Sequence, residues 1–351
     1  MLERFRQQLS PLLSNDVGID LGTANTLVYL RGKGIVVTEP SVVAINQKTG
    51  QVVAIGAQAK QMLGRTPGHL AAVRPLVDGV VSDFEATEEM LAHLMNRAQG
   101  IQKKMLGPRA VIGVPSGITN VEIRAVKDAA ENAGAREAFI VEEPIAAALG
   151  IRMPIREAIG NMIVDIGGGT TDIAVLSLGG IVRSKNLRIA GDKLNQDIIS
   201  YVRSEFKMLI GEKTAEEVKI AIGAILEGEG RLEAVVCGRD LISGLPREIV
   251  LTDSDIREAI SQSIDTLIES IREVLETTPP EILGDIIRSG IVLCGGGALI
   301  KGLAPLLAEW LKVPVMVADD PLTAVARGTG VILENLDLYK DMLIEYDEDL
   351  A

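Results

Sequence analysis

The sequence predicts an α/β protein built from two duplicated lobes, and three observations support this prediction. The chain has 351 residues, which is enough for two lobes with separate hydrophobic cores. Runs rich in Val and Ile alternate with Ala-rich segments, a pattern typical of buried sheets covered by helices. An apolar strand, an Asp and a Gly/Thr turn occur in this order twice, at residues 16–26 and 162–171. A duplicated lobe, with a cleft between the two copies, accounts for this repeat.

The first half of the chain begins with two short strands joined by a Gly/Thr turn. Thr119 and Glu122 form a capping box before a helix, and Gly134 provides the stop after it. Pro115 ends the strand that precedes this helix. We expect strands at residues 17–21, 27–30, 34–43, 52–55 and 109–114, and helices at residues 83–99 and 119–133.

The second half repeats this order of elements. A strand and a returning strand flank the second Gly/Thr turn, and a long helix ends at Pro279 and Pro280. A buried strand then runs directly into a cluster of three glycines. We expect strands at residues 162–166, 172–176, 232–240, 248–252 and 290–294, helices at 192–206, 214–226 and 253–277, and a further helix beyond Lys301.

Composition excludes several classes of protein. The formal net charge of −13 argues against a nucleic-acid groove, which needs clustered Lys and Arg, and against broad adhesion to an anionic membrane. Cys237 and Cys294 lie far apart, and the lack of a secretory signal favours a reducing compartment. No apolar run reaches the ~18–20 residues that a membrane-spanning helix needs. We therefore expect a cytoplasmic protein without a nucleic-acid partner.

The two Gly/Thr turns have the chemistry of a phosphate site. Glycine allows backbone N–H groups to converge on an anion, and Thr adds hydroxyl donors. Asp20 and Asp165 precede the turns, and a carboxylate there suits a magnesium ion beside the phosphates. Each turn alone could be an ordinary tight hairpin, and each Asp alone a turn-starting carboxylate. The repetition, together with the glycine cluster at residues 295–297, favours a phosphate site, although no Walker or dinucleotide fingerprint occurs.

These motifs resemble those of the actin, Hsp70 and sugar-kinase superfamily. Asp20-Leu-Gly-Thr is similar to its first phosphate motif, Asp165-Ile-Gly-Gly-Gly-Thr-Thr-Asp to the second, and Cys294-Gly-Gly-Gly-Ala to its adenosine motif. Within the superfamily, several longer motifs resemble the MreB family of bacterial actin-like cell-shape proteins. They begin at Gly18 (Gly-Ile-Asp-Leu-Gly-Thr-Ala-Asn-Thr), Glu39 (Glu-Pro-Ser-Val-Val), Gly113 (Gly-Val-Pro-Ser-Gly-Ile-Thr), Glu142 (Glu-Glu-Pro) and Thr277 (Thr-Thr-Pro-Pro-Glu).

The resemblance implies an actin-like (ribonuclease H-like) fold in which each lobe has a smaller subdomain. Residues 16–152 and 334–351 would form the first lobe, with its subdomain at about 33–78. Residues 153–333 would form the second lobe, with its subdomain at about 192–260. Residues 1–15 would be an N-terminal amphipathic membrane-binding segment.

The resemblance also implies roles for individual residues, with ATP or ADP and Mg²⁺ as cofactors. Asp20 and Asp165 would hold the Mg²⁺ shell. The nucleotide would be bound by the first turn (Gly22, Thr23, Ala24, Asn25), the second turn (Gly167, Gly168, Gly169, Thr170), the adenosine motif (Gly295, Gly296, Gly297, Ala298) and the ribose or base contacts (Glu216, Glu217, Lys219). For Glu217 there is an alternative, a capping box with Thr214.

Glu143 is the candidate to orient the attacking water in ATP hydrolysis, with Glu142 as the second candidate. Glu143 precedes Pro144, which suits the first helical position, so its carboxylate is expected at the start of a helix. From the residues alone, a charge that complements the helix dipole is an equal explanation. The resemblance favours the catalytic role and implies slow hydrolysis coupled to filament turnover.

Two segments are candidates for membrane contact. Leu2, Phe5 and Leu9 lie on one face of an amphipathic N-terminal helix, which could instead dock on the core or on a partner. Met105 and Leu106 form the apolar tip of a basic segment at residues 96–109, which could instead fold back onto the core. The resemblance favours peripheral attachment to the inner face of the cytoplasmic membrane.

The resemblance as a whole implies a slowly ATP-hydrolysing filament protein that organises cell-wall synthesis and sets cell shape. Its implied partners are further copies of itself, the membrane, and wall-synthesis and elongation-complex membrane proteins similar to RodZ, MreC and MreD. The alternatives are an actin-like protein of plasmid segregation or division, and a small-molecule kinase of the same superfamily.

Overall fold

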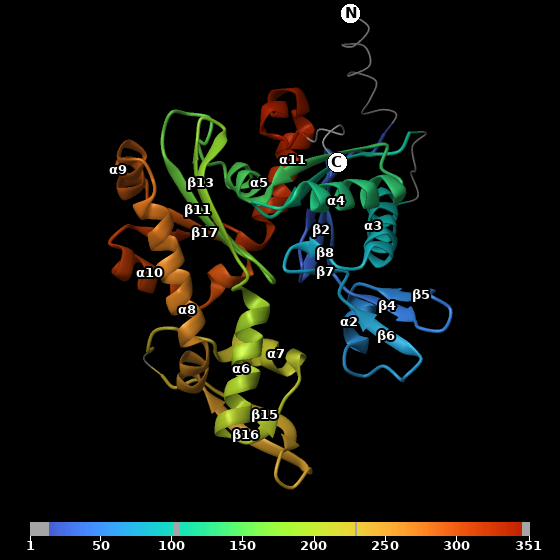
Figure 1. Cartoon of the computed structure of the whole chain (residues 1–351), viewed down its shortest axis with the longest axis vertical. Helices are drawn as coiled ribbons and strands as arrows, with labels where there is room; N and C mark the ends of the chain where they lie inside the picture. The colour runs from blue at the N-terminus through green and yellow to red at the C-terminus, as the bar shows by residue number, and fades with distance from the viewer. Residues whose placement is uncertain (1–13, 101–105, 229, 346–351) are drawn as a thin grey trace, which may run out of the picture. The chain divides into compact units, whose positions relative to one another are not determined.

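The computed structural model describes residues 14–100, 106–228 and 230–345, and these residues form two compact units (Figure 1). The first unit contains the described residues up to Ile159, the segment Leu176–Ile181, and the residues from Leu322 onward. The second unit contains Gly160–Val175 and Val182–Pro321. Both units combine sheets with helices, so the predicted α/β class is confirmed.

The main sheet of the first unit has five strands in the order β10-β9-β1-β2-β3. β1 runs parallel to β9, β9 runs parallel to β10, and β1, β2 and β3 form an antiparallel meander. Helix α3 packs beside α4, and α5 packs beside α11. The bounds are β1 Val17–Leu21, β2 Asn25–Leu30, β3 Gly34–Pro40, β9 Arg109–Val114, β10 Glu137–Glu142, α3 Phe84–Gln99, α4 Asn120–Asn132, α5 Glu143–Gly150 and α11 Ala324–Glu334.

The main sheet of the second unit has five strands in the order β13-β12-β11-β17-β18. Taken from the opposite edge, this order repeats that of the first unit. β11, β12 and β13 take the places of β1, β2 and β3, and β17 and β18 take those of β9 and β10. Again the first strand of the unit runs parallel to the last two, because β11 pairs with β17 and β17 with β18. The duplication predicted from the two turns therefore extends to the topology of the sheets. The bounds are β11 Asn161–Ile166, β12 Thr171–Ser177, β13 Gly180–Leu187, β17 Ile291–Cys294, β18 Val315–Val317, α8 Asp253–Glu276, α9 Pro280–Ser289 and α10 Leu303–Leu311.

Each unit also has a smaller sheet. In the first unit its order is β5-β4-β6, and in the second it is β14-β15-β16. The bounds are β4 Val43–Asn46, β5 Val52–Ile55, β6 Leu70–Val73, α2 Ala57–Met62, β14 Met208–Leu209, β15 Glu233–Asp240, β16 Pro246–Thr252, α6 Gly191–Glu205 and α7 Glu212–Ile222; the first unit also has the two-residue strands β7 Leu76–Val77 and β8 Val80–Val81.

The single strand predicted at residues 34–43 is wrong, because the chain divides there into β3 and β4. Pro40 has no N–H group with which to continue a ladder. The N–H group of Ser41 donates instead to the carbonyl of Ala24, 3.0 Å away, in the turn between β1 and β2. The chain therefore leaves the main sheet at Pro40 and enters the smaller sheet at Val43.

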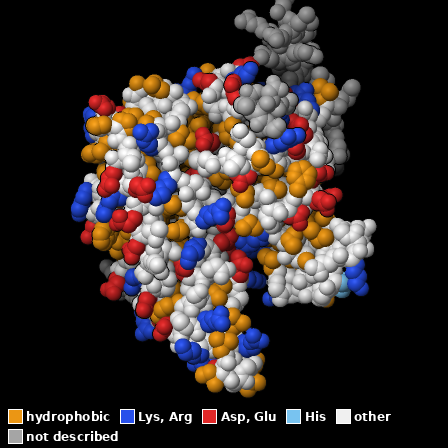
Figure 2. Space-filling model, in the orientation of Figure 1, with side chains coloured by type: hydrophobic (Ala, Val, Ile, Leu, Met, Phe, Trp, Pro, Cys, Tyr) orange, Lys and Arg blue, Asp and Glu red, His pale blue; other side chains and the backbone are white. Residues whose placement is uncertain are grey.

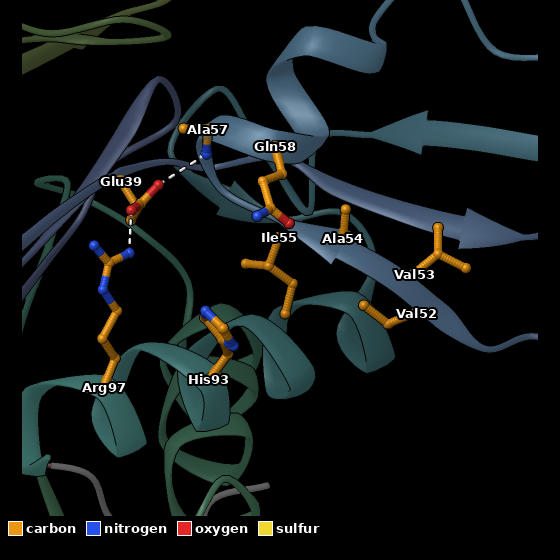
Figure 3. Close-up of a pocket in the computed structure, with 9 residues that line it drawn as sticks. All are labelled: Glu39, Val52, Val53, Ala54, Ile55, Ala57, Gln58, His93 and Arg97. Atoms are coloured by element: carbon orange, nitrogen blue, oxygen red, sulfur yellow. Dashed lines mark hydrogen bonds and ion pairs between the residues drawn. The ribbon is translucent and has the colours of Figure 1, made fainter.

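Glu39 connects the start of helix α2 to helix α3 (Figure 3). Its carboxylate accepts a hydrogen bond of 2.8 Å from the N–H of Ala57 at the start of α2, and it pairs with Arg97. Burial alone would raise the pKa of Glu39, but the hydrogen bonds from Ala57 and Arg97 outweigh burial and hold the pKa below its ordinary value. These contacts lie on one side of a groove of ≈ 650 Å³ between α3 and β5, with His93 opposite Ile55.

Helix α11 packs against the first unit with its backbone very close to the neighbouring elements. A Cβ atom added to Gly328 would overlap the carbonyl oxygen of Ala146, and one added to Gly150 would overlap that of Ala324. A Cβ on Gly330 would lie 2.7 Å from the ring of Tyr29. The close approach explains why Leu322–Glu334 belongs by its contacts to the first unit, whereas residues up to 333 were expected in the second lobe.

Candidate functional site

The first Gly/Thr turn connects β1 to β2 in the first unit. Asp20, one residue before the end of β1, lies between Leu27 of β2 and Gly113 of β9 in the sheet. A Cβ atom on Gly22 would lie 2.7 Å from the carbonyl oxygen of Asn25, so the turn can close only with glycine at this position. The predicted motif therefore forms the tight turn that the sequence indicates.

The side chain of Thr23 points into the unit. Thr23 is buried, and its Oγ1 accepts a hydrogen bond of 3.0 Å from the N–H of Gly79. A hydroxyl that accepts one hydrogen bond can still donate its own proton. Ala24 is half-buried and Asn25 is exposed. Of the four predicted residues of this turn, Asn25 is therefore the most accessible.

Ser41 is a contact of this turn that the sequence analysis missed. Its Oγ donates a hydrogen bond of 2.6 Å to the carbonyl of Gly22, and it also contacts Oγ1 of Thr26 at 2.9 Å. With the backbone bond to Ala24, one fully buried serine occupies two carbonyls of the turn. The available signal was the Glu-Pro-Ser motif itself, where a proline stops a strand next to a small hydroxyl residue.

The two glutamates predicted for catalysis lie at the same edge of this sheet. Glu142 ends β10 opposite Val114 of β9, and Glu143 begins helix α5, followed by Pro144 in its first turn. The Cγ of Glu143 lies 3.5 Å from the position of a Cβ on Gly113, the residue beside Asp20 in the sheet. The carboxyl ends of three parallel strands therefore bring Asp20, Glu142 and Glu143 to one edge.

The second Gly/Thr turn, Gly167 to Thr170, connects β11 to β12 in the second unit. The N–H of Gly167 donates to the carbonyl of Thr170 at 2.9 Å, which closes the turn. Two other carbonyls of the turn accept hydrogen bonds from the N-terminus of α6. Gly191 donates to Gly167 at 3.1 Å, and Asp192 donates to Gly168 at 2.8 Å. In both units, therefore, two carbonyls of the turn are occupied by donors from a later segment.

Asp165 is buried at the end of β11, next to Cys294 of β17. Desolvation and the nearby charge of Asp172 raise the pKa of Asp165 to about 7, while a hydrogen bond with Cys294 opposes this shift. Asp172 itself accepts a hydrogen bond of 3.0 Å from the side chain of Asn186. Because the surroundings disfavour its negative charge, Asp165 is a carboxylate that a bound cation would stabilise.

The glycine cluster follows β17 directly beside Asp165. Gly295 has a φ of 77°, and a Cβ atom there would overlap both Oδ1 of Asp165 and the carbonyl of Ile166. A Cβ on Gly297 would overlap the side chain of Ile166. Gly296 to Leu299 then form a short 3₁₀ turn in which Gly297 and Ala298 are buried. The cluster thus lies against the same strand end as the second turn.

The three remaining predicted residues, Glu216, Glu217 and Lys219, lie on helix α7. Lys219 reaches α6, where its Nζ donates to the carbonyl of Gly191 at 2.7 Å, next to the second turn. Glu216 is half-buried, and Glu217 is exposed and lies 3.8 Å from Lys213. The alternative capping box of Thr214 and Glu217 is wrong, because α7 begins at Glu212 after Gly211, so Thr214 lies inside the helix.

The predicted membrane residues Leu2, Phe5, Leu9 and Met105 lie outside the described residues. Leu106 is described and exposed. The basic character expected for residues 96–109 is lower than the sequence suggests, because Arg97 pairs with Glu39 and Arg109 pairs with the buried Asp16 at 2.7 Å. Of the helices that the structure describes, none has both the length and the apolar character needed to span a bilayer.

Comparison with known proteins identifies the class of this fold. The chain is similar to the crystal structure of MreB5 of Spiroplasma citri bound to ADP, with a TM-score of 0.88, 39% identity, and coverage of 93% of this chain and 98% of the other. A structure of the same protein bound to AMPPNP matches equally well. The MamK double helical filament matches with a TM-score of 0.79 and 26% identity over 92% of this chain and 99% of the other. The protein has an actin-like fold.

Sequence comparison gives the family. The model of the MreB/Mbl family matches residues 14–341. The cell shape-determining protein Mbl of Bacillus subtilis is 49% identical over 93% of this chain and 98% of its own length. The cell shape-determining protein MreB of Escherichia coli is 49% identical over 97% and 98%, respectively. The chain belongs to the MreB/Mbl family.

Proposed function

We propose that this chain binds ATP or ADP with Mg²⁺ through the turns at residues 22–25 and 167–170. The observation that carries the proposal is the arrangement common to both units: a strand with Asp near its end, a Gly/Thr turn, and two turn carbonyls held by donors from elsewhere. Holding these carbonyls fixes the direction of the backbone N–H groups of the turn, and converging N–H groups suit phosphate oxygens. The ADP and AMPPNP in the related MreB5 structures support a nucleotide as the ligand.

The proposed site residues fall into groups that bind different parts of Mg-ATP. Asp20 and Asp165 are proposed to hold Mg²⁺ directly or through its waters. Among the described residues no group of three or more His, Cys, Asp or Glu side chains could hold a metal alone, which suits an ion that binds one or two carboxylates plus phosphates and waters. Bound Mg²⁺ would neutralise phosphate charge. Gly295 to Ala298 are proposed to pack on the adenosine, and Glu216, Glu217 and Lys219 to contact the ribose or base.

Glu143 is proposed to accept a hydrogen bond from the attacking water during slow ATP hydrolysis. Its position at the first residue of α5, beside Gly113 and Asp20, fixes the direction of its carboxylate. Glu142 is the second candidate, since it lies at the end of the adjacent strand. Either glutamate would act on the water, and the turns would bind the phosphates.

Self-association into filaments is the second part of the proposal. The similar MamK structure is a double helical filament. In the second unit, hydrophobic side chains gather at the tip of the hairpin between β15 and β16 (Figure 2), where Ile242 is 85% and Leu245 is 64% exposed. An exposed apolar tip that meets a different surface of the next copy would give an open, head-to-tail assembly.

Replacing Ile242 by Asp is expected to reduce ATP-dependent sedimentation at least about ten-fold, because a charge would then be desolvated in each subunit contact. The monomer should remain folded, since the side chain has few contacts of its own. Leu178→Asp is the matched control, because Leu178 is 71% exposed and lies elsewhere. Equal sedimentation of the wild type and Ile242→Asp would remove the hairpin tip from the subunit contact.

Peripheral attachment to the inner face of the cytoplasmic membrane, through residues 1–13 and Leu106, is the third part. Deleting residues 1–13 is expected to lower co-sedimentation with anionic liposomes about ten-fold while leaving the affinity for Mg-ATP unchanged, because avidity in a filament multiplies a weak anchor. Polymerisation without liposomes serves as the control. If the truncated chain pelleted with liposomes as well as the full chain, residues 1–13 would have no anchoring role.

Together these activities describe a membrane-associated filament that organises cell-wall synthesis and sets cell shape, with elongation-complex membrane proteins similar to RodZ, MreC and MreD as partners. The test is ATP-dependent sedimentation with and without liposomes, scored beside phosphate release. Phosphate transfer to a sugar would favour the kinase alternative. Filaments that form without any preference for lipid would favour an actin-like protein of plasmid segregation or division.

A further inference from the structure

Different groups hold the carbonyls of the two turns in place. In the second unit the carbonyls of Gly167 and Gly168 are occupied by backbone N–H groups of α6. Among the described residues of the first unit, no helix N-terminus donates to the carbonyls of the first turn. The carbonyls of Gly22 and Ala24 are occupied by Ser41, one through its hydroxyl and one through its backbone N–H.

The orientation of these carbonyls matters for an anion. A carbonyl oxygen that points toward a phosphate repels it, whereas an N–H group that points toward it attracts it. A peptide plane is rigid, so fixing the carbonyl of Gly22 also fixes the N–H of Thr23, and fixing the carbonyl of Ala24 fixes the N–H of Asn25. Ser41 therefore determines the direction of two backbone donors in the turn.

Ser41 is itself held firmly. Its side chain has no exposed surface, and its Oγ lies 2.9 Å from Oγ1 of Thr26, a fully buried hydroxyl in β2. The residues on either side of Ser41 in the chain are also held by hydrogen bonds. The carboxylate of Glu39 accepts one from the N–H of Ala57, and the carbonyl of Val42 accepts one of 2.9 Å from the N–H of Gly56. The serine thus acts on the turn from the fixed connection between β3 and β4.

We propose that Ser41 is a positioning residue for nucleotide binding, which orients the N–H groups of Thr23 and Asn25 toward the phosphates without touching the nucleotide. This inference rests on the proposed function of the turn. An ordinary structural serine would stabilise the fold to a similar degree, but its loss would leave the affinity for nucleotide unchanged.

The test compares Ser41→Ala with Ser263→Ala in the full-length chain. Ser263 is also a buried serine, and its hydroxyl donates to Asp197 inside α6, five residues beyond Asp192, the last α6 residue that contacts the second turn. Isothermal titration with Mg-ATP is expected to give a Kd about ten-fold higher for Ser41→Ala, the effect of about one lost hydrogen bond, and an unchanged Kd for Ser263→Ala. Thermal melting without nucleotide measures the loss of stability in each variant.

Steady-state phosphate release separates positioning from instability. A misdirected turn raises KM for ATP, whereas partial unfolding lowers kcat by reducing the active fraction and leaves KM unchanged. Ser41→Cys keeps a weak donor at nearly the same volume and is expected to give a KM between those of the wild type and Ser41→Ala. If Ser41→Ala does not fold, the Kd of Ser41→Cys decides in its place.

The outcomes distinguish this inference from the proposed function. If the wild type binds Mg-ATP and the folded Ser41 variant has the same Kd and KM, Ser41 is only structural and the inference fails alone. If the wild type shows no binding of Mg-ATP, the proposed function fails first. A higher Kd and KM for the Ser41 variants, with Ser263→Ala unchanged, supports both.

Discussion

Replacing Asp165 by Asn is expected to weaken Mg-ATP binding more than 100-fold while making the nucleotide-free protein more stable. The loss follows from removing a carboxylate proposed to hold Mg²⁺, since a neutral amide is a much poorer partner for this ion; a 100-fold change corresponds to about 2.7 kcal/mol. The gain in stability follows because Asp165 is buried beside Asp172, where its negative charge is disfavoured. Neutralising it should stabilise the protein at pH 8 by about 2 kcal/mol.

The two effects are measured separately, by titration with Mg-ATP and by urea unfolding without nucleotide. Asp240→Asn is the matched control, and its expected change in stability has the opposite sign. Hydrogen bonds from Ser243 and Arg247 lower the pKa of Asp240 to about 2, so its charge stabilises the fold above its unfolded pKa and this contribution is lost as the pH falls toward 2. Asp240→Asn should therefore destabilise the protein and leave nucleotide affinity unchanged. Normal Mg-ATP binding by Asp165→Asn would contradict its role at the metal.

Replacing Gly328 by Ala is expected to destabilise the protein by about 3 kcal/mol, a large value for one methyl group. The added Cβ would overlap the carbonyl oxygen of Ala146, which belongs to the backbone of α5 and cannot move as a side chain does. The helix propensity of Ala, worth up to about 1 kcal/mol over Gly, offsets only part of this cost. Urea unfolding measures the difference.

Gly284→Ala is the control for helix propensity. Gly284 lies inside α9, and among the described residues the only neighbour within reach of its Cβ is the flexible end of Arg288 at 3.9 Å. The free energy of unfolding of this variant should be higher by up to about 1 kcal/mol. If Gly328→Ala and Gly284→Ala shifted stability in the same direction, the close packing of α5 and α11 would not be limiting. A normal Kd for Mg-ATP in folded Gly328→Ala would show that the change acts on stability alone.

The sequence predicted the parts of the fold that depend on local patterns. The two turns, their aspartates and the long helix from Asp253 were predicted because glycines, capping residues and hydrophobic periodicity act within a few residues. The capping box of Thr119 and Glu122 is confirmed. Asp20 and Asp165 lie near strand ends, where parallel strands bring their carboxyl ends to one edge of each sheet. Glu216, Glu217 and Lys219 lie on helix α7 instead.

What could not be predicted depends on partners distant in sequence. The role of Ser41 at the first turn needs the register of β2 with β3. The strand predicted over residues 34–43 did not take into account the break that Pro40 indicates. The pairing of Arg97 with Glu39 and of Arg109 with Asp16 likewise required the fold, since the sequence shows only a run of basic residues. The placement of α11 in the first unit depends on the close approach that Gly328 and Gly330 of α11 and Gly150 of α5 allow.

The position of α11 has a consequence for biosynthesis. The helix completes the core of the first unit, yet it is translated only after nearly all of the second unit. Until then the nascent chain presents the apolar faces of α5 and β1, which are buried in the finished protein, without their partner. Contacts of such long sequence separation form slowly, and exposed apolar surface promotes misassembly. The first unit can therefore fold completely only after the second unit has been synthesised.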